Sequence, residues 1–182
     1  MPVNLDDKEL LYQFKDENTR EHAFTQIIKK YQEKLYWHIR RMVIEHEDAN
    51  DVLQNMFIKV WNALGNFRED SQLYTWLYRV ATNECLTFLE QQKKRNSVFL
   101  NDMDGLSNKL RSETNFDASR LEWKLQLGIQ KLPEKQRIVF NLRYYDEMPY
   151  EEMSKVLNTS EGALKASYHH AAKKIEEFIL NS

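Results

Sequence analysis

Cationic and imidazole side chains gather near the end of the chain, where acids are scarce. In the stretch GALKASYHHAAKK, Lys165, His169 and Lys173 recur at intervals of four residues, which places them on one face of a helix. Such a face can meet the phosphates of a nucleic acid. Small residues begin the same segment and leave room for close approach to the backbone: Gly162, Ala163 and Ala166. An ordinary helical hairpin with a solvated basic face would show the same pattern.

A second group of polar side chains lies in the middle of the chain. Thr75, Tyr78, Arg79 and Thr82 share one arc of an expected helix, with Asn83 beside them. The segment FREDS, which carries Phe67, Arg68 and Ser71, comes just before, and the cluster QQKKR ends the helix. Aromatic groups beside Arg, Thr and Asn can bind unstacked bases of a single strand, at roughly 1–3 kcal/mol per stacked base. The alternative is a plain helix surface with no ligand.

A third pattern indicates a docking face for a protein. Asp51, Asn55, Ile58 and Asn62 fall on one side of the helix before this one, opposite its apolar stripe. An apolar Ile among polar neighbours favours contact with a partner, although a solvated face with one stray Ile is also common.

Catalytic chemistry finds no support in the sequence. His22, His38, His46 and the pair His169-His170 lack metal-ligand spacing with Cys85 or with one another. No Gly-rich phosphate loop and no nucleophile with a base can be found. We therefore expect no enzyme activity, no metal, no cofactor and no small-molecule substrate.

The elements that carry these groups are predicted to be helices. Four Gly and three Pro in 182 residues are few for a sheet protein, and the long segments follow a 3.6-residue period. We predict helices over 21–45, over 48–64 with Gly65-Asn66 at its C-terminal end, and over 71–94 with Ser71 as its N-cap. The stretch that follows has no period, and we interpret it as a linker; a long surface loop within one domain is the alternative.

Four more helices are expected after this linker. Patterning resumes at about residue 117, Pro133 and Pro149 fit the starts of two helices, and Ser160 fits the N-cap of the last. Only Asn158 and Thr159 separate the last two helices. This arrangement predicts a helix-turn-helix whose second helix enters the major groove of DNA.

The net charge, hydropathy and cysteine count of the chain exclude several classes of protein. The formal net charge of −2 argues against a protein that coats nucleic acid by bulk charge, and no apolar run is long enough to span a membrane. The N-terminal segment lacks the basic start and apolar core of a secretory signal. A lone cysteine excludes a disulfide framework and favours a reducing compartment, so we expect a cytoplasmic protein.

Two blocks of the sequence resemble the bacterial sigma factors of the small extracytoplasmic-function group. The C-terminal YEEMSKVLNTSEGALKASYHHAAKKI is similar to that family's DNA-reading helix-turn-helix, although Asn158 replaces a usual Gly and Ser167 a usual Arg. Upstream, DVLQNMFIKVWNAL and NFREDSQLYTWLYRVATNECLTFL are similar to the family's front domain. Together the blocks cover roughly 80% of the chain in family order, which is far more specific than either block alone.

The resemblance implies an all-α fold of two small helical domains joined by a flexible linker, with a C-terminal helix-turn-helix. The domains would be 1–95 (sigma region 2), the linker 96–116, and 117–182 (sigma region 4). It also assigns residues to three surfaces. Binding to the core polymerase falls to Asp51, Gln54, Asn55 and Ile58. Binding to the melted minus-ten strand falls to Phe67, Arg68, Ser71, Thr75, Arg79 and Asn83. Reading of the minus-thirty-five duplex falls to Ser160, Glu161, Ala163, Lys165, Ala166, Ser167, His169 and Lys173.

The resemblance further implies a monomer that works with RNA polymerase core enzyme and promoter DNA, and an anti-sigma factor that covers these surfaces. A stand-alone helix-turn-helix regulator would share the C-terminal motif but would need a dimer face and a basic surface. A helical adaptor with no effect on transcription is the third possibility.

Overall fold

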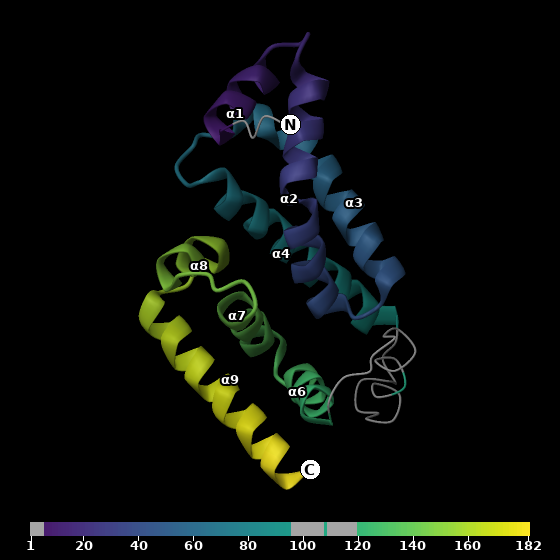
Figure 1. Ribbon diagram of the computed structural model, residues 1–182, viewed down its shortest axis with the longest axis vertical. Coiled ribbons are helices and arrows are strands. Elements are labelled where there is room, and N and C mark those ends of the chain that lie inside the picture. The colour runs from purple at the N-terminus through teal and green to yellow at the C-terminus, as the bar shows by residue number, and fades with distance from the viewer. Residues whose placement is uncertain (1–5, 96–107, 109–119) are drawn as a thin grey trace.

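The computed structural model describes residues 6–95, 108 and 120–182, and within these residues it contains helices and no strand. The front module, residues 6–95, is a bundle of four α-helices (Figure 1). Their bounds are α1 Asp7–Lys15, α2 Arg20–Val43, α3 His46–Ala63 and α4 Leu73–Arg95, with one 3₁₀ turn, η1, at Leu64–Asn66. The predicted linker 96–116 lies outside the described residues apart from Asn108.

The first helix, α1, has no counterpart among the predicted elements. It buries Leu10 and Phe14, and the Phe14 ring meets Trp61 of α3 edge-on at 5.4 Å between centroids. At its start, the hydroxyl of Tyr31 donates a hydrogen bond of 2.7 Å to Oδ2 of Asp7. Because α1 is only nine residues long, these contacts with α2 and α3 hold it, rather than its own helix propensity.

The back module, residues 120–182, contains the four expected helices. They are α6 Arg120–Gln130, α7 Glu134–Tyr144, α8 Tyr150–Leu157 and α9 Glu161–Asn181. Helices α6 and α7 both pack along α9. Gly128 permits the α6 contact, since a Cβ at this position would lie 3.1 Å from the Phe178 ring. Pro133 and Pro149 precede α7 and α8 directly, as their fixed φ predicts.

Two predicted helix ends are wrong in detail. The helix expected to begin after Ser71 begins at Leu73, so Ser71 lies two residues before it and is not its N-cap. The helix expected over 48–64 ends at Ala63, and Gly65-Asn66 do not terminate it as a cap but belong to the 3₁₀ turn η1 that follows. Both boundaries differ from the predicted ones by one or two residues, a detail that residue preferences alone do not determine.

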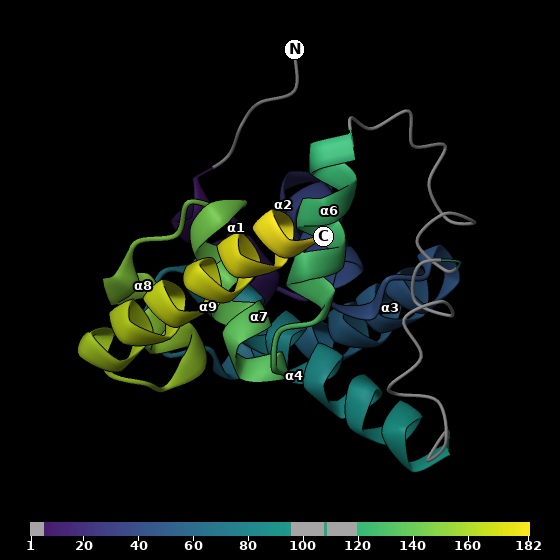
Figure 2. The same ribbon diagram turned by 90° about the horizontal axis from the view of Figure 1, so that it is seen from below.

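The two modules pack directly against each other. Helix α8 contacts α4 and α7 contacts α2. The back module lies below the front module in Figure 1 and in front of it in Figure 2. One continuous cluster of buried apolar side chains runs from the front module into the back one, where it includes Leu142, Met148 and Met153. A second, smaller cluster lies wholly within the back module around Phe140 and Ile175. The modules therefore share a core in this arrangement.

Candidate nucleic-acid and polymerase interfaces

The last helix is built as the sequence predicts. Ser160 is its N-cap, and its Oγ accepts a hydrogen bond of 3.3 Å from the backbone N–H of Ala163. Asn158 ends α8 in the left-handed conformation, with φ 50° and ψ 48°, which Asn tolerates better than most residues. The turn between α8 and α9 thus follows from two identifiable local signals.

Aromatic stacking fixes α9 on α7. The Phe140 ring of α7 is stacked on Tyr168 of α9 at 5.6 Å and on Tyr144 at 5.1 Å. Burial raises the pKa of Tyr168. With Leu164, Ala171 and Ile175 buried beside it, this contact turns the opposite side of α9 outward.

The residues expected to read a duplex all lie on this outward side, which we call the α9 face. Ser167 is half-buried and the others are exposed: Ser160, Glu161, Ala163, Lys165, Ala166, His169 and Lys173. A Cβ added to Gly162 would meet nothing within 4 Å, so the start of the helix is open to a ligand. The Lys165 ammonium lies 3.9 Å from the Glu161 carboxylate, a pair that a phosphate could separate because both groups are solvated.

The expected polymerase-binding residues also share one exposed surface. Asp51, Gln54 and Asn55 are exposed on α3, and the Ile58 side chain between them is 54% exposed. An exposed Ile ringed by polar groups is typical of a docking face, while Val52, Met56 and Val60 on the other side of α3 are buried.

The six residues expected to hold a melted strand are not equally accessible. Arg68, Arg79 and Asn83 are exposed, and Ser71 and Phe67 are half-buried, with the Phe67 ring 5.1 Å from Trp76. Thr75 is buried at 1% exposure, because its hydroxyl donates a hydrogen bond to the carboxylate of Glu152 in α8. Thr75, Tyr78 and Thr82, which we call the α4 face, are all covered by the back module or by α2.

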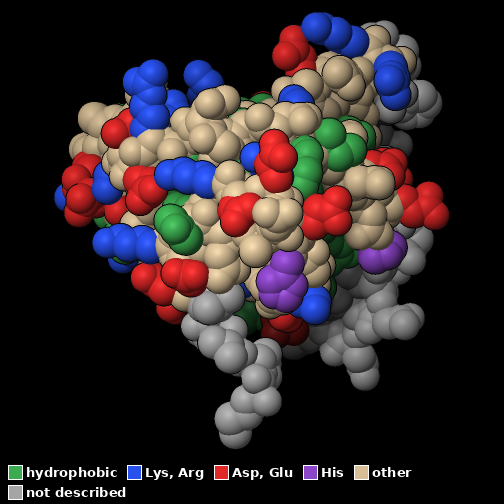
Figure 3. All heavy atoms as spheres, turned by 90° about the horizontal axis from the view of Figure 1, so that it is seen from above, with side chains coloured by type: hydrophobic (Ala, Val, Ile, Leu, Met, Phe, Trp, Pro, Cys, Tyr) green, Lys and Arg blue, Asp and Glu red, His purple; other side chains and the backbone are tan. Residues whose placement is uncertain are grey.

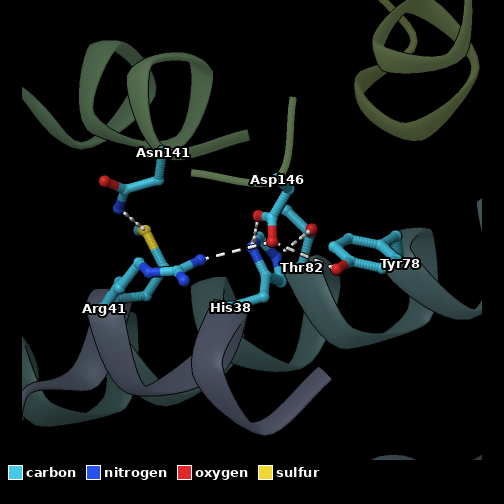
Figure 4. A network of polar contacts seen from close by, with 7 residues as sticks. His38, Arg41, Tyr78, Thr82, Asn141 and Asp146 are labelled. Carbon is cyan, nitrogen blue, oxygen red and sulfur yellow. Dashed lines mark hydrogen bonds and ion pairs between the residues drawn. The ribbon is translucent and has the colours of Figure 1, made fainter. Parts of the chain in front are cut away.

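A buried polar cluster lies where the α4 face meets the back module, and the sequence patterns did not reveal it (Figure 4). Asp146, in the turn after α7, points between α2 and α4. Its Oδ1 accepts hydrogen bonds of 3.3 Å from Nη1 of Arg41 and 3.2 Å from the hydroxyl of Tyr78. Its Oδ2 lies 3.7 Å from Nδ1 of His38, whose Nε2 is 2.9 Å from the Thr82 hydroxyl. His38 within the apolar stripe of α2 was the one available signal.

Burial dominates the proton affinities in this cluster. It lowers the pKa of His38 to about 3, with help from the nearby Arg41 guanidinium. It also raises the pKa of Asp146, although Arg41 and the Tyr78 hydroxyl act in the opposite direction. The imidazole is therefore neutral at pH 7.

The described surface carries no sign of a metal site or a membrane segment. Among residues 6–95, 108 and 120–182, no three His, Cys, Asp or Glu side chains are placed to hold a metal ion. No helix in this part of the chain is both long and apolar enough to cross a membrane. Acidic and basic side chains are interspersed on the face seen from above (Figure 3), in line with the net charge of −2.

Comparison with known proteins matches both modules. The family description "Sigma-70 region 2" matches residues 27–95, and "Sigma-70, region 4" matches residues 123–175. The RNA polymerase sigma-H factor of Pseudomonas aeruginosa is 31% identical over 166 residues, which are 86% of each chain. The ECF RNA polymerase sigma-E factor of Escherichia coli K12 is 30% identical over 168 residues, again 86% of each chain.

Solved structures share the fold. CnrH, in complex with the cytosolic domain of CnrY, has a TM-score of 0.68 at 24% identity and matches 97% of this chain and 98% of its own. The sigma factor RpoE of Bartonella quintana, in complex with the anti-sigma factor NepR, has a TM-score of 0.64 at 19% identity and matches 86% of this chain and 96% of its own.

The helical fold, the helix-turn-helix and these matches define a transcription initiation factor. The chain belongs to the sigma-70 family, in its extracytoplasmic-function group. Proteins of this kind bind RNA polymerase core enzyme and direct it to promoters.

Proposed function

We propose that this sigma factor divides its work among three surfaces. Asp51, Gln54, Asn55 and Ile58 of α3 dock on the core polymerase. The melted minus-ten strand is held by six residues: Phe67, Arg68, Ser71, Thr75, Arg79 and Asn83. The α9 face reads the minus-thirty-five duplex. The observation that carries this proposal is the α9 face itself, which is open to solvent and backed by a buried stripe.

The proposed division of the chain follows the same logic, with region 2 in 1–95, a linker in 96–116 and region 4 in 117–182. The protein acts in the cytoplasm as one copy per polymerase, and its role is binding, with no reaction of its own. The similar sigma factor RpoE is in complex with the anti-sigma factor NepR, so we propose that an anti-sigma factor also covers surfaces of this chain.

The polymerase surface is tested by the double variant Asp51→Lys with Ile58→Glu. It reverses one charge and replaces the exposed apolar side chain with a carboxylate, so co-purification with core enzyme should be lost while the circular dichroism spectrum is unchanged. The matched control is Glu17→Lys with Tyr12→Glu, which makes the same charge changes at exposed positions outside this surface. Equal recovery of both variants with polymerase would remove the assignment.

The duplex surface is tested by the double variant Lys165→Ala with His169→Ala. Loss of two contacts to phosphate or bases should weaken binding of the holoenzyme to promoter duplex by about 1–3 kcal/mol, or roughly five- to 150-fold. Lys8→Ala with His22→Ala removes the same residue types from an exposed part of the front module and serves as control. An unchanged response to mutations in the minus-thirty-five element would show that α9 does not enter this groove.

A stand-alone helix-turn-helix regulator is the remaining alternative for the C-terminal motif. It would bind its site without polymerase and as a dimer. Run-off transcription with purified core enzyme and genomic DNA separates the two, since only a sigma factor confers start sites on the core enzyme.

A further inference from the structure

Buried polar atoms that lack a partner are concentrated at the contact between the two modules. Four side-chain atoms in the described residues are buried without a hydrogen bond: Nδ1 of His38, Nε of Arg137, Oδ1 of Asn141 and Oδ2 of Asp146. All four residues lie where the back module meets α2 or α4, since Arg137 is close to Cys85 of α4 and Asn141 donates to Sδ of Met42. Such atoms weaken a contact, because they regain hydrogen bonds with water when it opens.

Among the hydrogen bonds that cross this contact, those of Asp146 reach both α2 and α4. Asp146 accepts from Arg41 and Tyr78 at 3.3 and 3.2 Å, near the upper limit for such bonds (Figure 4). Four further polar contacts cross the same boundary. The Gln130 amide donates to the backbone oxygen of Arg41 at 3.2 Å, and Asn141 donates to Sδ of Met42 at 3.5 Å. Thr75 donates to Glu152, and Lys93 pairs with Glu134 at 2.6 Å.

Each side of the contact carries polar groups beside its apolar ones. The front side offers the hydroxyls of the α4 face and His38, and the back side offers Glu152, Asn141 and Asp146. A permanent core is apolar, whereas contacts between units that separate are more polar. Leu142 and Met148 of the back module add apolar burial to this contact.

We infer that the free chain is closed on itself, that the back module must leave α2 and α4 before the α4 face can act, and that Asp146 holds the closed form. This inference rests on the proposed function in one respect, the role of Thr75 in binding the minus-ten strand. The covering of Thr75 by Glu152 makes the closed chain an inactive form.

Closure can be measured in the intact chain without DNA or polymerase. A water-soluble carbodiimide activates a carboxylate and joins it to an adjacent amine as an amide. Lys93 and Glu134, 2.6 Å apart across the boundary, report closure. Lys59 and Glu84 pair within the front module and serve as the internal control. Peptide mass spectrometry quantifies both products, and X-ray scattering gives the radius of gyration.

The test compares Asp146→Ala with Glu151→Ala, which removes an exposed carboxylate from α8. In Asp146→Ala we expect at least a fivefold loss of the Lys93–Glu134 product, an unchanged Lys59–Glu84 product and a larger radius of gyration. Glu151→Ala should match the parent chain. If Asp146→Ala does not fold, as loss of the Lys59–Glu84 product would show, Tyr78→Phe replaces it and should lower the Lys93–Glu134 product twofold or more. Unchanged Lys93–Glu134 product and scattering in the folded variant would overturn the inference.

Run-off transcription then separates this inference from the proposed function. If closure inhibits, Asp146→Ala should reach half-maximal transcript at a several-fold lower concentration than the parent chain. Opening of the variant with no change in this concentration would overturn the inhibitory role. If the variant opens but neither the parent nor the variant yields a transcript, the proposed function is wrong, whereas the inference that the free chain is closed still holds.

Discussion

The α4 face and the α9 face began as the same kind of prediction and ended differently. Both belong to polar arcs that were expected to bind nucleic acid, and on the α4 arc the assigned residues Arg79 and Asn83 are exposed while Thr75 is not. Lys165, His169 and Lys173 of the α9 face stand in solvent, whereas Thr75, Tyr78 and Thr82 of the α4 face are each about 1% exposed. The comparison teaches that local periodicity reveals which side of a helix is polar, but not whether another part of the chain covers it.

The largest effect on this comparison should come from the shared core. Leu142 is fully buried in the cluster that spans both modules, and Leu142→Ala should lower the free energy of unfolding by about 2–5 kcal/mol. It should also expose the α4 face, which the carbodiimide product of Lys93 and Glu134 would report as a loss. Urea unfolding measures the stability.

Ile175→Ala is the control for this variant. Ile175 belongs to the cluster confined to the back module, so its loss should reduce stability without opening the contact between modules. If both substitutions open the chain equally, the modules do not separate along the α4 face.

Acid should lower the free energy of unfolding through His38, which lies at the covered face. The pKa of His38 is about 3 in the folded chain, below its ordinary value of about 6.5, so only the unfolded chain takes up this proton between the two values. The contribution is complete above pH 6.5 and is lost as the pH falls, by up to about 1.4 kcal/mol per unit. The raised pKa of Asp146 offsets part of this loss at the acid end, and Arg41 and Tyr78 are the other ionisable groups at the cluster.

The measurement is the difference between the parent chain and His38→Gln in urea unfolding at pH 7.0 and 5.5. The parent should lose about 1 kcal/mol more than the variant over this interval, since other carboxylates and imidazoles contribute equally to both. Parallel pH profiles would mean that His38 is not the responsible group.

A smaller effect is expected at the start of the α9 face. Ser160→Ala removes the side-chain N-cap of α9, and it should cost about 1 kcal/mol of stability. Amide hydrogen exchange should rise in the first turn of α9 and remain unchanged in α4. Increased exchange in both helices would show that the two faces are coupled more tightly than the closed contact implies.

The smallest effect is expected at the turn between α8 and α9. Asn158 has φ 50°, a conformation that Gly adopts without a Cβ penalty, so Asn158→Gly should raise stability by a few tenths of a kcal/mol. Thermal unfolding should shift upward by about a degree or two. A clear loss of stability would mean that the Asn side chain contributes more than its backbone conformation.

Most helix boundaries of the back module could be predicted from single residues. Pro133, Pro149, Asn158 and Ser160 each do in the structure what their backbone chemistry predicts, and they place α7, α8 and α9 within a residue or two. The short α1 was missed because its helix depends on Phe14 reaching Trp61, a contact between residues far apart in sequence.

The same limit applies to the sites. The exposed quartet on α3 and the α9 face follow from helix geometry, because their apolar backs are visible in the sequence. The partner of Thr75 is Glu152, 77 residues away, and that of Tyr78 is Asp146, 68 residues away. No pattern within one helix contains this information.

Cys85 carries a practical consequence of the packing. It is the single cysteine of the chain, it has no exposed surface, and burial raises the pKa of its thiol. Reagents that attack thiolates should therefore not react with it. Fluorophores or spin labels attached to cysteines introduced on α3 and α9 would then be the sole probes on the molecule, and its domain motions could be followed one particle at a time during promoter opening.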